Sequence, residues 1–531
     1  MALLARLVFL GLASAEVSRL ESWHDISGAA SAGAGGTVVV PYVEVVPGAG
    51  RAEVPPNASV AIGSAGGATV NGTGASRFFV VQGELALSNL TLVDGYNGSY
   101  GGGVAVGGAG TLVLRNVSMS GCVSAFGGAV YALGALYVAG GTFSRNVAAR
   151  STPEVDGTGG FGDVFYAAGP THVDGSNFLD NGVDDGLGYG WDQWNAAVDP
   201  AGEGVAIWNA AASGAFVASR CTLRSTGAGA RMNAAATVSE TGKTLILSSG
   251  GFLNVQRNDD GVLLSGIDAR GLDADAVVAV SGCAGGYAEY NSTYAGNFLY
   301  LGTHALWNGD APSLHLEGLE IVGNYGFTSG GIVSIWEDDK QARSLRVVDS
   351  AFRGNLGSFG GAIAISDVGT TAAEVVGCVF EGNNAYRELA FYGGGGAIWH
   401  GGTSPAALNV TRSTLAGNSA AMMGGAIYSI GELRVESSTC IYNVAAGDGG
   451  CIATASLALE RWDFVNDIME GFNYAGVVTV VDSTFAGNAA LFGGAVSVDD
   501  GELSVLRCVF EANDPAEGEH GEPTLQLPLW Q

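Results

Sequence analysis

The residues with the clearest chemical potential lie in an acidic and aromatic segment that begins at position 180. Its carboxylates are Asp180, Asp184, Asp185 and Asp192, and its aromatic side chains are Tyr189, Trp191 and Trp194. Paired carboxylates held a few ångströms apart hydrolyse glycosidic bonds. Aromatic side chains present flat apolar faces, on which sugar rings can stack. The four aspartates are therefore our catalytic candidates, and the three aromatic residues are our candidates for ligand binding.

Other features of the sequence argue against catalysis. Solvated turns are a simpler explanation for this acidic segment, and also for the acidic runs at 258–260 and 337–339. The chain has only six histidines, none of them in a motif, and it lacks the Gly-His-Gly and Arg-Ile-Lys signatures of polygalacturonases. A calcium-binding repeat of the nonapeptide type needs tandem copies, whereas Gly159–Asp163 is a single near-match.

We therefore expect a chain that binds rather than cuts, with no cofactor and no metal site. Calcium stays open, because dispersed acidic side chains can attract it. An extracellular polysaccharide lyase or glycoside hydrolase with an acidic site near residues 180–192 is the alternative.

A repeated phrase indicates which elements would position such a site. Phe352-Arg-Gly-Asn355 is followed by Gly360-Gly-Ala-Ile363, and close variants of this pair return four more times before a final half copy at Phe510. Such recurring residues are expected to stack, because a solenoid places equivalent positions above one another. The positions expected to form this structural ladder are Phe352, Asn355, Phe380, Asn383, Asn418, Asn443, Phe485, Asn488, Phe510 and Asn513.

Each copy of the phrase reads as strand, turn, strand. The run before each phenylalanine alternates between apolar and polar residues, which is typical of strands, and we expect the phenylalanine to end that strand facing inward. Asparagine suits a turn because it tolerates the left-handed region, and Gly-Gly bends the chain where a side chain would clash. Units of 25 to 28 residues indicate a solenoid. The predicted fold class is all-β, a right-handed parallel β-helix.

The paired motif resembles the repeats of the chlamydial polymorphic outer membrane proteins. The resemblance rests on Phe-x-x-Asn alternating with Gly-Gly-Ala-Ile or Gly-Gly-Ala-Val, as at Phe380-Glu-Gly-Asn383 with Gly395-Gly-Ala-Ile398, and it covers about half of the chain. Members of that family are surface-exposed adhesins with a right-handed β-helix of the pectin-lyase-like class. The resemblance implies the same fold and a role in adhesion to cells.

Composition and charge narrow the classes of partner. Of 531 residues, 87 are glycine and only 12 are proline, which favours many tight turns over disorder. Lys and Arg number 22 against 51 Asp and Glu, so the formal net charge is −29. A chain this acidic is not expected to bind nucleic acid. Extracellular glycans or cell-surface proteins are the expected partners.

Several signals point to export. Residues 1–15 read as a signal peptide, with Arg6 before an apolar run and a small-residue cleavage site. No later segment is predicted to span a membrane, so we expect an extracellular or cell-surface location. Sequons for N-glycosylation occur at Asn57, Asn71, Asn89, Asn97, Asn116, Asn291 and Asn409. The seven cysteines leave at least one unpaired, and their places on repeat positions favour small buried residues over a disulfide framework, although Cys440 and Cys451 could still bridge within one coil.

The predicted organisation follows from these signals. Residues 16–50 form an N-terminal cap and first strand, 51–185 β-helix repeats, 186–310 irregular coils with long loops, 311–514 regular repeats and 515–531 a tail. An adhesin-like or glycan-binding scaffold without catalytic activity is the predicted function, and a structural cell-wall or coat component is a further alternative.

Overall fold

The computed structural model describes most of the chain, and the account below is restricted to those residues. They are 18–38, 40–45, 50–149, 162–179, 181, 207–209, 216–224, 236–238, 245–247, 253–255, 262–265, 268–270, 277–280, 287–290, 292–295, 300–305, 314–324, 333–337, 343–357, 359–367, 370–386, 394–401, 407–454, 457–463, 468–474, 476–499 and 501–515. They belong to two compact units, Met1–Ser213 and Gly214–Gln531.

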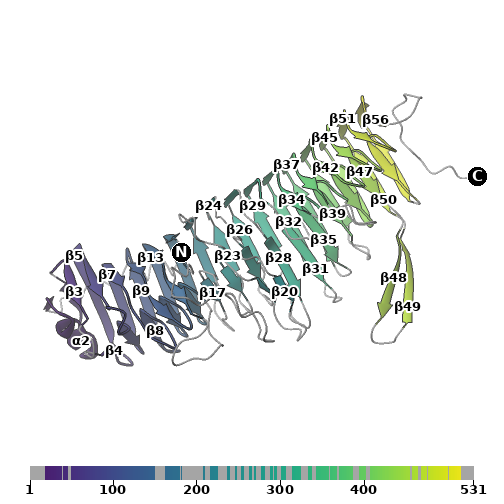
Figure 1. Ribbon diagram of the computed structural model, residues 1–531. Coiled ribbons are helices and arrows are strands. Elements are labelled where there is room, and N and C mark those ends of the chain that lie inside the picture. Colours follow the sequence, from purple (N-terminus) through teal and green to yellow (C-terminus); the bar gives the residue numbers. More distant parts are fainter. Residues whose placement is uncertain are drawn as a thin grey trace, which may run out of the picture. The chain divides into compact units, whose positions relative to one another are not determined.

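Both units are built from short parallel strands. Equivalent strands of successive coils pair with each other, and the only helix in the described part of the chain is α2 (Trp23–Ser31). This arrangement confirms the predicted all-β, parallel β-helix fold. Among the described residues, antiparallel pairing is confined to two local pairs, of which the hairpin of β48 (Leu457–Asp463) and β49 (Ile468–Tyr474) stands apart from the stacked coils in Figure 1.

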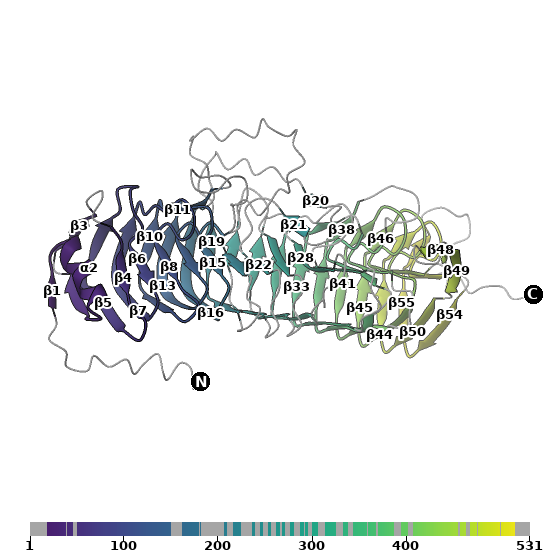
Figure 2. The ribbon, with the colours of Figure 1, turned by 90° about the horizontal axis from the view of Figure 1, so that it is seen from below.

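In the first unit, two long rows of strands stack coil upon coil (Figure 2), and β11 (Val123–Ser124) and β14 (Val147–Ala148) form a third, short parallel pair. One row consists of β5 (Ser59–Asn71), β7 (Glu84–Val93), β9 (Thr111–Arg115), β13 (Ala135–Ser144) and β16 (Thr171–Leu179), with β10 (Ser118–Ser120) beside β7 and β13. The other row consists of β4 (Ala52–Val54), β6 (Phe79–Val81), β8 (Val104–Val106), β12 (Val130–Ala132), β15 (Phe165–Ala167) and β17 (Ile207–Asn209). Inward and outward side chains alternate along each strand, so the short β12 and β15 each direct one residue outward.

Helix α2 covers the first coils of this unit. Ser22 and Asp25 form a reciprocal capping box at its start. Its apolar side, with Trp23 and Ile26, is buried against β4 and against β1 (Ser18–Leu20). The indole of Trp23 meets Phe78 and Phe79 edge-on. The helix therefore shields a coil end whose unpaired backbone groups would otherwise be exposed.

The second unit has four rows of strands, and its regular coils contribute one strand to each row (Figure 1). The first row is β29 (Leu314–Glu317), β32 (Arg343–Val348), β36 (Thr370–Val376), β40 (Ala407–Thr411), β44 (Glu432–Glu436), β50 (Val477–Val481) and β54 (Glu502–Leu506). The second is β30 (Glu320–Val322), β33 (Ala351–Arg353), β37 (Val379–Glu381), β41 (Thr414–Ala416), β45 (Thr439–Ile441), β51 (Thr484–Ala486) and β55 (Val509–Glu511). The third is β34 (Leu356–Gly357), β38 (Asn384–Ala385), β42 (Ser419–Ala420), β46 (Val444–Ala445), β52 (Ala489–Ala490) and β56 (Asp514–Pro515). The fourth includes β31 (Val333–Glu337), β35 (Ile363–Asp367), β39 (Ile398–His400), β43 (Ile427–Ser429), β47 (Ile452–Thr454) and β53 (Val496–Val498).

The anatomy of one coil differs from the expectation in two details. A left-handed residue, Asp349, separates the alternating run from Phe352, which lies in its own short strand β33 instead of ending the longer one. The left-handed residue of the Asn turn is Gly354, while Asn355 is buried and has no positive φ. Asparagine is therefore used for its side-chain amide, and glycine supplies the backbone conformation.

The phenylalanines of the repeat stack in the interior. Phe352 pairs in register with Phe380, both are fully buried, and their ring centroids are 5.0 Å apart with planes only 6° from parallel. Phe485 and Phe510 repeat this stack at 5.0 Å. In the coils between them, Leu415 and a cysteine take the same place, which keeps the column apolar.

The asparagines form a continuous hydrogen-bonded ladder along one corner. The side-chain oxygen of Asn383 accepts hydrogen bonds from the backbone N–H and the Nδ2 of Asn355, and its own Nδ2 donates to the side-chain oxygen of Asn418 and to the carbonyl of Phe352. The pattern repeats from coil to coil, so each buried amide is satisfied by its neighbours. The ladder runs through Asn324, Asn355, Asn383, Asn418, Asn443, Asn488 and Asn513.

A second ladder lies at the bend two residues before each phenylalanine. The hydroxyl oxygen of Ser438 accepts the backbone N–H of Ser413, and the hydroxyl oxygen of Ser483 accepts the N–H of Ser438. Each of these hydroxyls donates to the carbonyl two residues earlier. Within the coil of Ser438, Cys440 of β45 and Cys451, which directly follows a Gly-Gly bend, form a disulfide.

Candidate functional site

The predicted site residues of the acidic segment lie outside the residues that the structure describes. They are Asp180, Asp184, Asp185, Tyr189, Trp191, Asp192 and Trp194. Within the described ranges, no three His, Cys, Asp or Glu side chains come close enough together to hold a metal ion. The arrangement that the structure does bring together is a group of four aromatic side chains on the outside of the first unit.

This aromatic cluster consists of Tyr100, Phe126, Tyr131 and Tyr166. Strands β12 and β15 pair so that Tyr131 lies beside Tyr166. In each strand the two flanking residues are buried and the tyrosine is half-buried, which places both tyrosines on the outer face. Their ring centroids are 5.0 Å apart and their planes differ by 18°, which is a stacked geometry.

The other two members come from the bends that precede these strands. Tyr100 and Phe126 form a parallel bridge just before the glycines of two successive coils, and their rings stack at 5.4 Å. The ring of Tyr100 lies 4.8 Å from that of Tyr131, and Tyr100 remains 45% exposed. Phe126 meets Tyr166 edge-on at 5.9 Å. The cluster is thus a partly exposed aromatic surface that spans successive coils.

The phenols of Tyr131 and Tyr166 stay protonated at neutral pH. Burial raises the pKa of Tyr131 to about 12, with smaller contributions from Tyr166 and Tyr100. Burial also raises the pKa of Tyr166, with a smaller contribution from Tyr100. A protonated phenol both donates and accepts hydrogen bonds. The cluster therefore combines partly exposed apolar ring surface with polar groups that can bond to hydroxyls.

The sequence does contain a pattern that marks this cluster, but the pattern lies outside the repeated Phe-x-x-Asn phrase. An aromatic residue directly precedes the glycines of the bend at Tyr100 and Phe126, and another occupies the middle of the following strand at Tyr131 and Tyr166. Strand β17 continues the row, with Trp208 in register with Tyr166. Only the register of successive coils shows that these positions meet.

Equivalent aromatic positions in the second unit are covered. Trp399 and Tyr428 occupy the middle of β39 and β43 but are only 6% and 3% exposed. They pack with Phe359 and Ile430 in a small satellite core, with Met423 against it. These rings stabilise the outer wall and are not available to a ligand.

The sequons have accessible positions wherever the structure describes them. Asn57, Asn89 and Asn116 are exposed, whereas Asn71 and Asn97 are half-buried, as is Asn409. The amide nitrogen of Asn71 donates to the hydroxyl of Tyr42, and that of Asn116 donates to the side-chain oxygen of Asn89. Asn291 lies outside the described residues. Glycosylation at these sites stays a prediction.

Comparison with solved structures shows a likeness to proteins of known structure. Among solved structures, the chain is similar to the periplasmic alginate epimerase AlgG over 92% of this chain and 88% of that one, with 11% sequence identity and a TM-score of 0.25. No protein-family model matches the chain, and no curated protein matches it. Among the described residues, no helix has both the length and the apolar character needed to cross a membrane.

Proposed function

We propose that this protein is a secreted or surface-displayed, adhesin-like scaffold that binds extracellular glycans through the aromatic cluster and does not catalyse a reaction. The observation that carries the proposal is the partly exposed stack of Tyr100, Phe126, Tyr131 and Tyr166 on the outside of the β-helix. Export and the absence of catalysis rest on the sequence.

Inward side chains fill the core and stabilise the coils, so an outward ring is not needed to form a strand. A contiguous, partly exposed aromatic group in a soluble protein marks a binding surface. Parallel strands lie about 4.8 Å apart, and the ring separations of 4.8 to 5.4 Å follow this spacing. The surface therefore offers successive rings along one direction, which suits an extended chain of sugar rings.

The disulfide supports an oxidising location. Cys440 and Cys451 are joined within one coil of the second unit, and stable disulfides form mainly in secreted and cell-surface proteins. The dispersed negative charge of the chain favours solubility outside the cell. Both observations agree with the predicted signal peptide.

The test is retention of the full chain on immobilised neutral and acidic polysaccharides. Tyr131→Ala and Tyr166→Ala should each reduce retention at least tenfold. Tyr137→Ala is the matched control, because Tyr137 is a half-buried tyrosine of strand β13 in the other row. Circular dichroism and the thermal midpoint establish that each variant is folded.

The possible outcomes separate the candidate functions. Equal retention of all three variants would remove the aromatic cluster as the site, and no retention on any glycan would leave a structural wall or coat component. Reducing ends, or the ultraviolet absorbance of an unsaturated product, would reveal an enzyme. If Asp184→Asn or Asp185→Asn then abolished turnover, the acidic segment would be catalytic.

A further inference from the structure

We propose that a hollow beside the aromatic cluster, lined by Arg51 and Arg77, binds an oxyanion carried by the glycan, either a uronate carboxylate or a sulfate ester. This inference rests on the proposed function and names the class of glycan. It also defines a second site, chemically different from the aromatic surface, that can be tested without that surface.

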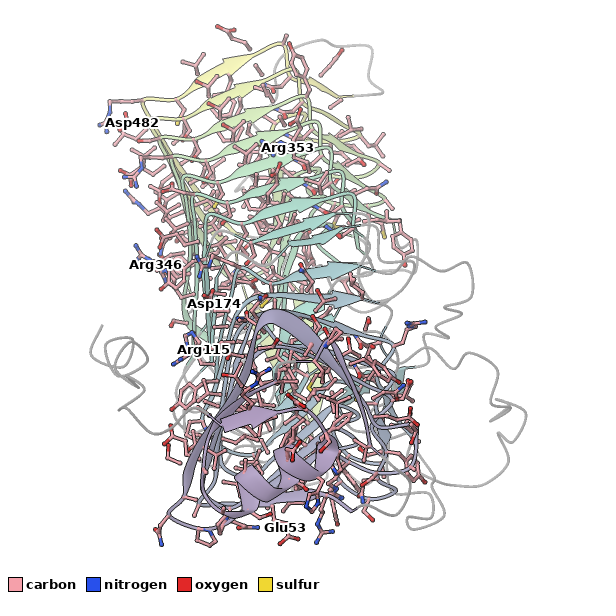
Figure 3. The ribbon with its side chains drawn as sticks, turned by 90° about the vertical axis from the view of Figure 1, so that its left-hand side faces the viewer. Glu53, Arg115, Asp174, Arg346, Arg353 and Asp482 are labelled. Atoms are coloured by element: carbon pink, nitrogen blue, oxygen red, sulfur yellow. A yellow bond between two sulfur atoms is a disulfide. The ribbon has the colours of Figure 1, made fainter. Side chains whose placement is uncertain are left out.

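The hollow has a volume of about 490 Å³, within the range of roughly 300–1,000 Å³ that is usual for small-ligand sites. Arg51 and Glu53 belong to the segment of β4, Arg77 directly precedes the buried Phe78, and Tyr96 comes from the following coil. In Figure 3, Glu53 lies on the outside of the first unit, close to helix α2.

Arg77 has unusual surroundings for an arginine. It is half-buried, and within the part of the chain that the structure describes its guanidinium has no carboxylate partner. Its Nε is buried and makes no hydrogen bond. Burial, and then the nearby charge of Arg51, lower the pKa of Arg77 to about 10, so it is still positively charged at neutral pH. A buried charge without a partner is costly, and a bound anion would remove that cost.

Arg51 adds a second positive charge at the same hollow. Among the described residues its carboxylate partner is Glu53 at 3.1 Å, and both side chains are more than half exposed, so this pair is well screened. Several other arginines of this acidic chain each have a carboxylate partner of their own. Arg346 pairs with Glu374, and Arg353, which Figure 3 also labels, reaches both Glu320 and Glu381. At this hollow, two guanidinium groups therefore face the single carboxylate of Glu53, in a protein of charge −29.

The hollow adjoins the aromatic cluster along the chain. Tyr96, Asn97 and Gly98 line it, and Tyr100, the most exposed ring of the cluster, follows two residues later. The amide oxygen of Asn97 accepts the backbone N–H of Ser99 and of Tyr100, which fixes this short connection. A sugar chain stacked on the rings can thus present a charged substituent to the arginines. Guanidinium groups bind carboxylate and sulfate oxygens through two parallel hydrogen bonds.

The experiment uses the full chain made in a host without N-glycosylation, so that Asn97 is unmodified. Binding of galacturonate, glucose 6-sulfate and glucose is followed by calorimetry and by fluorescence, because the indole of Trp23 donates a hydrogen bond to the carbonyl of Gly50 at the hollow. Trp23→Phe identifies the part of the signal that comes from this residue. The two anions should bind and glucose should not, and the tighter anion identifies the source of the oxyanion.

The decisive variant is Arg77→Gln, which keeps a polar amide and removes the charge. It should weaken anion binding at least tenfold, whereas the control Arg346→Gln should not change it. Tyr137→Ala, in the other row of strands, should leave the binding of the single sugars unchanged, whereas Tyr131→Ala should weaken the binding of a longer acidic oligosaccharide. Anion binding that is insensitive to Arg77→Gln, or no anion binding at all, would overturn this inference. Retention of neutral glycans would still support the aromatic cluster, so the two proposals fail separately.

Discussion

The asparagine ladder gives a sharp test of how the coils are held together, because Asn383 and Asn384 are adjacent and face opposite ways. Asn383 is fully buried and makes four side-chain hydrogen bonds: two accepted from Asn355, one donated to Phe352 and one donated to Asn418. Asn384 is exposed and pairs through its backbone. Asn383→Ala removes all four bonds, whereas Asn384→Ala removes none of the ladder.

The expected cost follows from those four bonds. At about 1 kcal/mol for each intramolecular hydrogen bond, Asn383→Ala should lower the free energy of unfolding by about 4 kcal/mol. The buried N–H of Asn355 is left without its acceptor, which keeps the effect near that value. Asn384→Ala should change the stability by less than about 0.5 kcal/mol, as surface substitutions usually do.

Hydrogen exchange is the appropriate assay, because long repeat arrays need not unfold in one step. Peptides that cover residues 350–390 should lose protection in the Asn383→Ala variant by a factor between about 100 and 1,000, at 1.4 kcal/mol for each power of ten. Asn383→Asp keeps the accepting oxygen, but it places a second carboxylate oxygen against the carbonyl of Phe352 and the side-chain oxygen of Asn418, which are themselves acceptors. This variant should therefore be less stable at pH 7, and part of its stability should return when the carboxylate is protonated. Equal protection in the Asn383 and Asn384 variants would refute the view that the ladder holds the coils in register.

Three further predictions concern the core of the second unit. Phe380→Ala should lower the stability by about 3–5 kcal/mol in denaturant titrations, since a fully buried, stacked ring is removed; a loss below about 0.5 kcal/mol would mean that the ring does not contribute to the core. Gly361→Ala should lower the thermal midpoint, because a Cβ there would lie 2.4 Å from a backbone oxygen. Gly108→Ala should leave the midpoint unchanged, because a Cβ at Gly108 would meet open space. Equal midpoints would show that the Gly-Gly bend accommodates a side chain. Burial lowers the pKa of His400 from 6.5 to about 4. Between these pH values the unfolded chain binds more protons than the folded chain. The free energy of unfolding should therefore fall as the pH drops from 6.5 to 4, by up to roughly 3 kcal/mol. His400→Gln should remove that part of the pH dependence and the exposed His24→Gln should not; an unchanged profile in His400→Gln would assign it to other groups.

Much of the fold was predictable because the repeat encodes it directly. Phe380 recurs where the core needs an apolar side chain, and Gly361 lies where any side chain would meet backbone. The position of the bends was harder to predict. The signal is a serine or cysteine two residues before each phenylalanine, as at Ser350 and Cys378, and its meaning appears only when Ser350 is seen to accept a hydrogen bond from Leu319 in the preceding coil.

The candidate site was less predictable, because it depends on which residues of different coils become neighbours. The sequence predicts a site in the acidic segment because carboxylates are dense there, and this segment lies outside the described residues. Arg51 and Arg77 are 26 positions apart in a region without the repeat phrase, and neither belongs to a motif. Their proximity follows from one turn of the solenoid, which returns the chain to nearly the same place.

The outward positions of the coils decide where binding can occur. Tyr131 and Trp399 hold equivalent places in the middle of short strands, since both are flanked by inward residues. Trp399 is covered by Phe359 and its neighbours, while Tyr131 remains partly exposed beside Tyr100. The same repeat therefore uses an aromatic residue as wall packing in one unit and as accessible surface in the other. Because the fold itself tolerates either use, the exposed rings and the adjoining arginines of the first unit are the features that core stability alone does not explain.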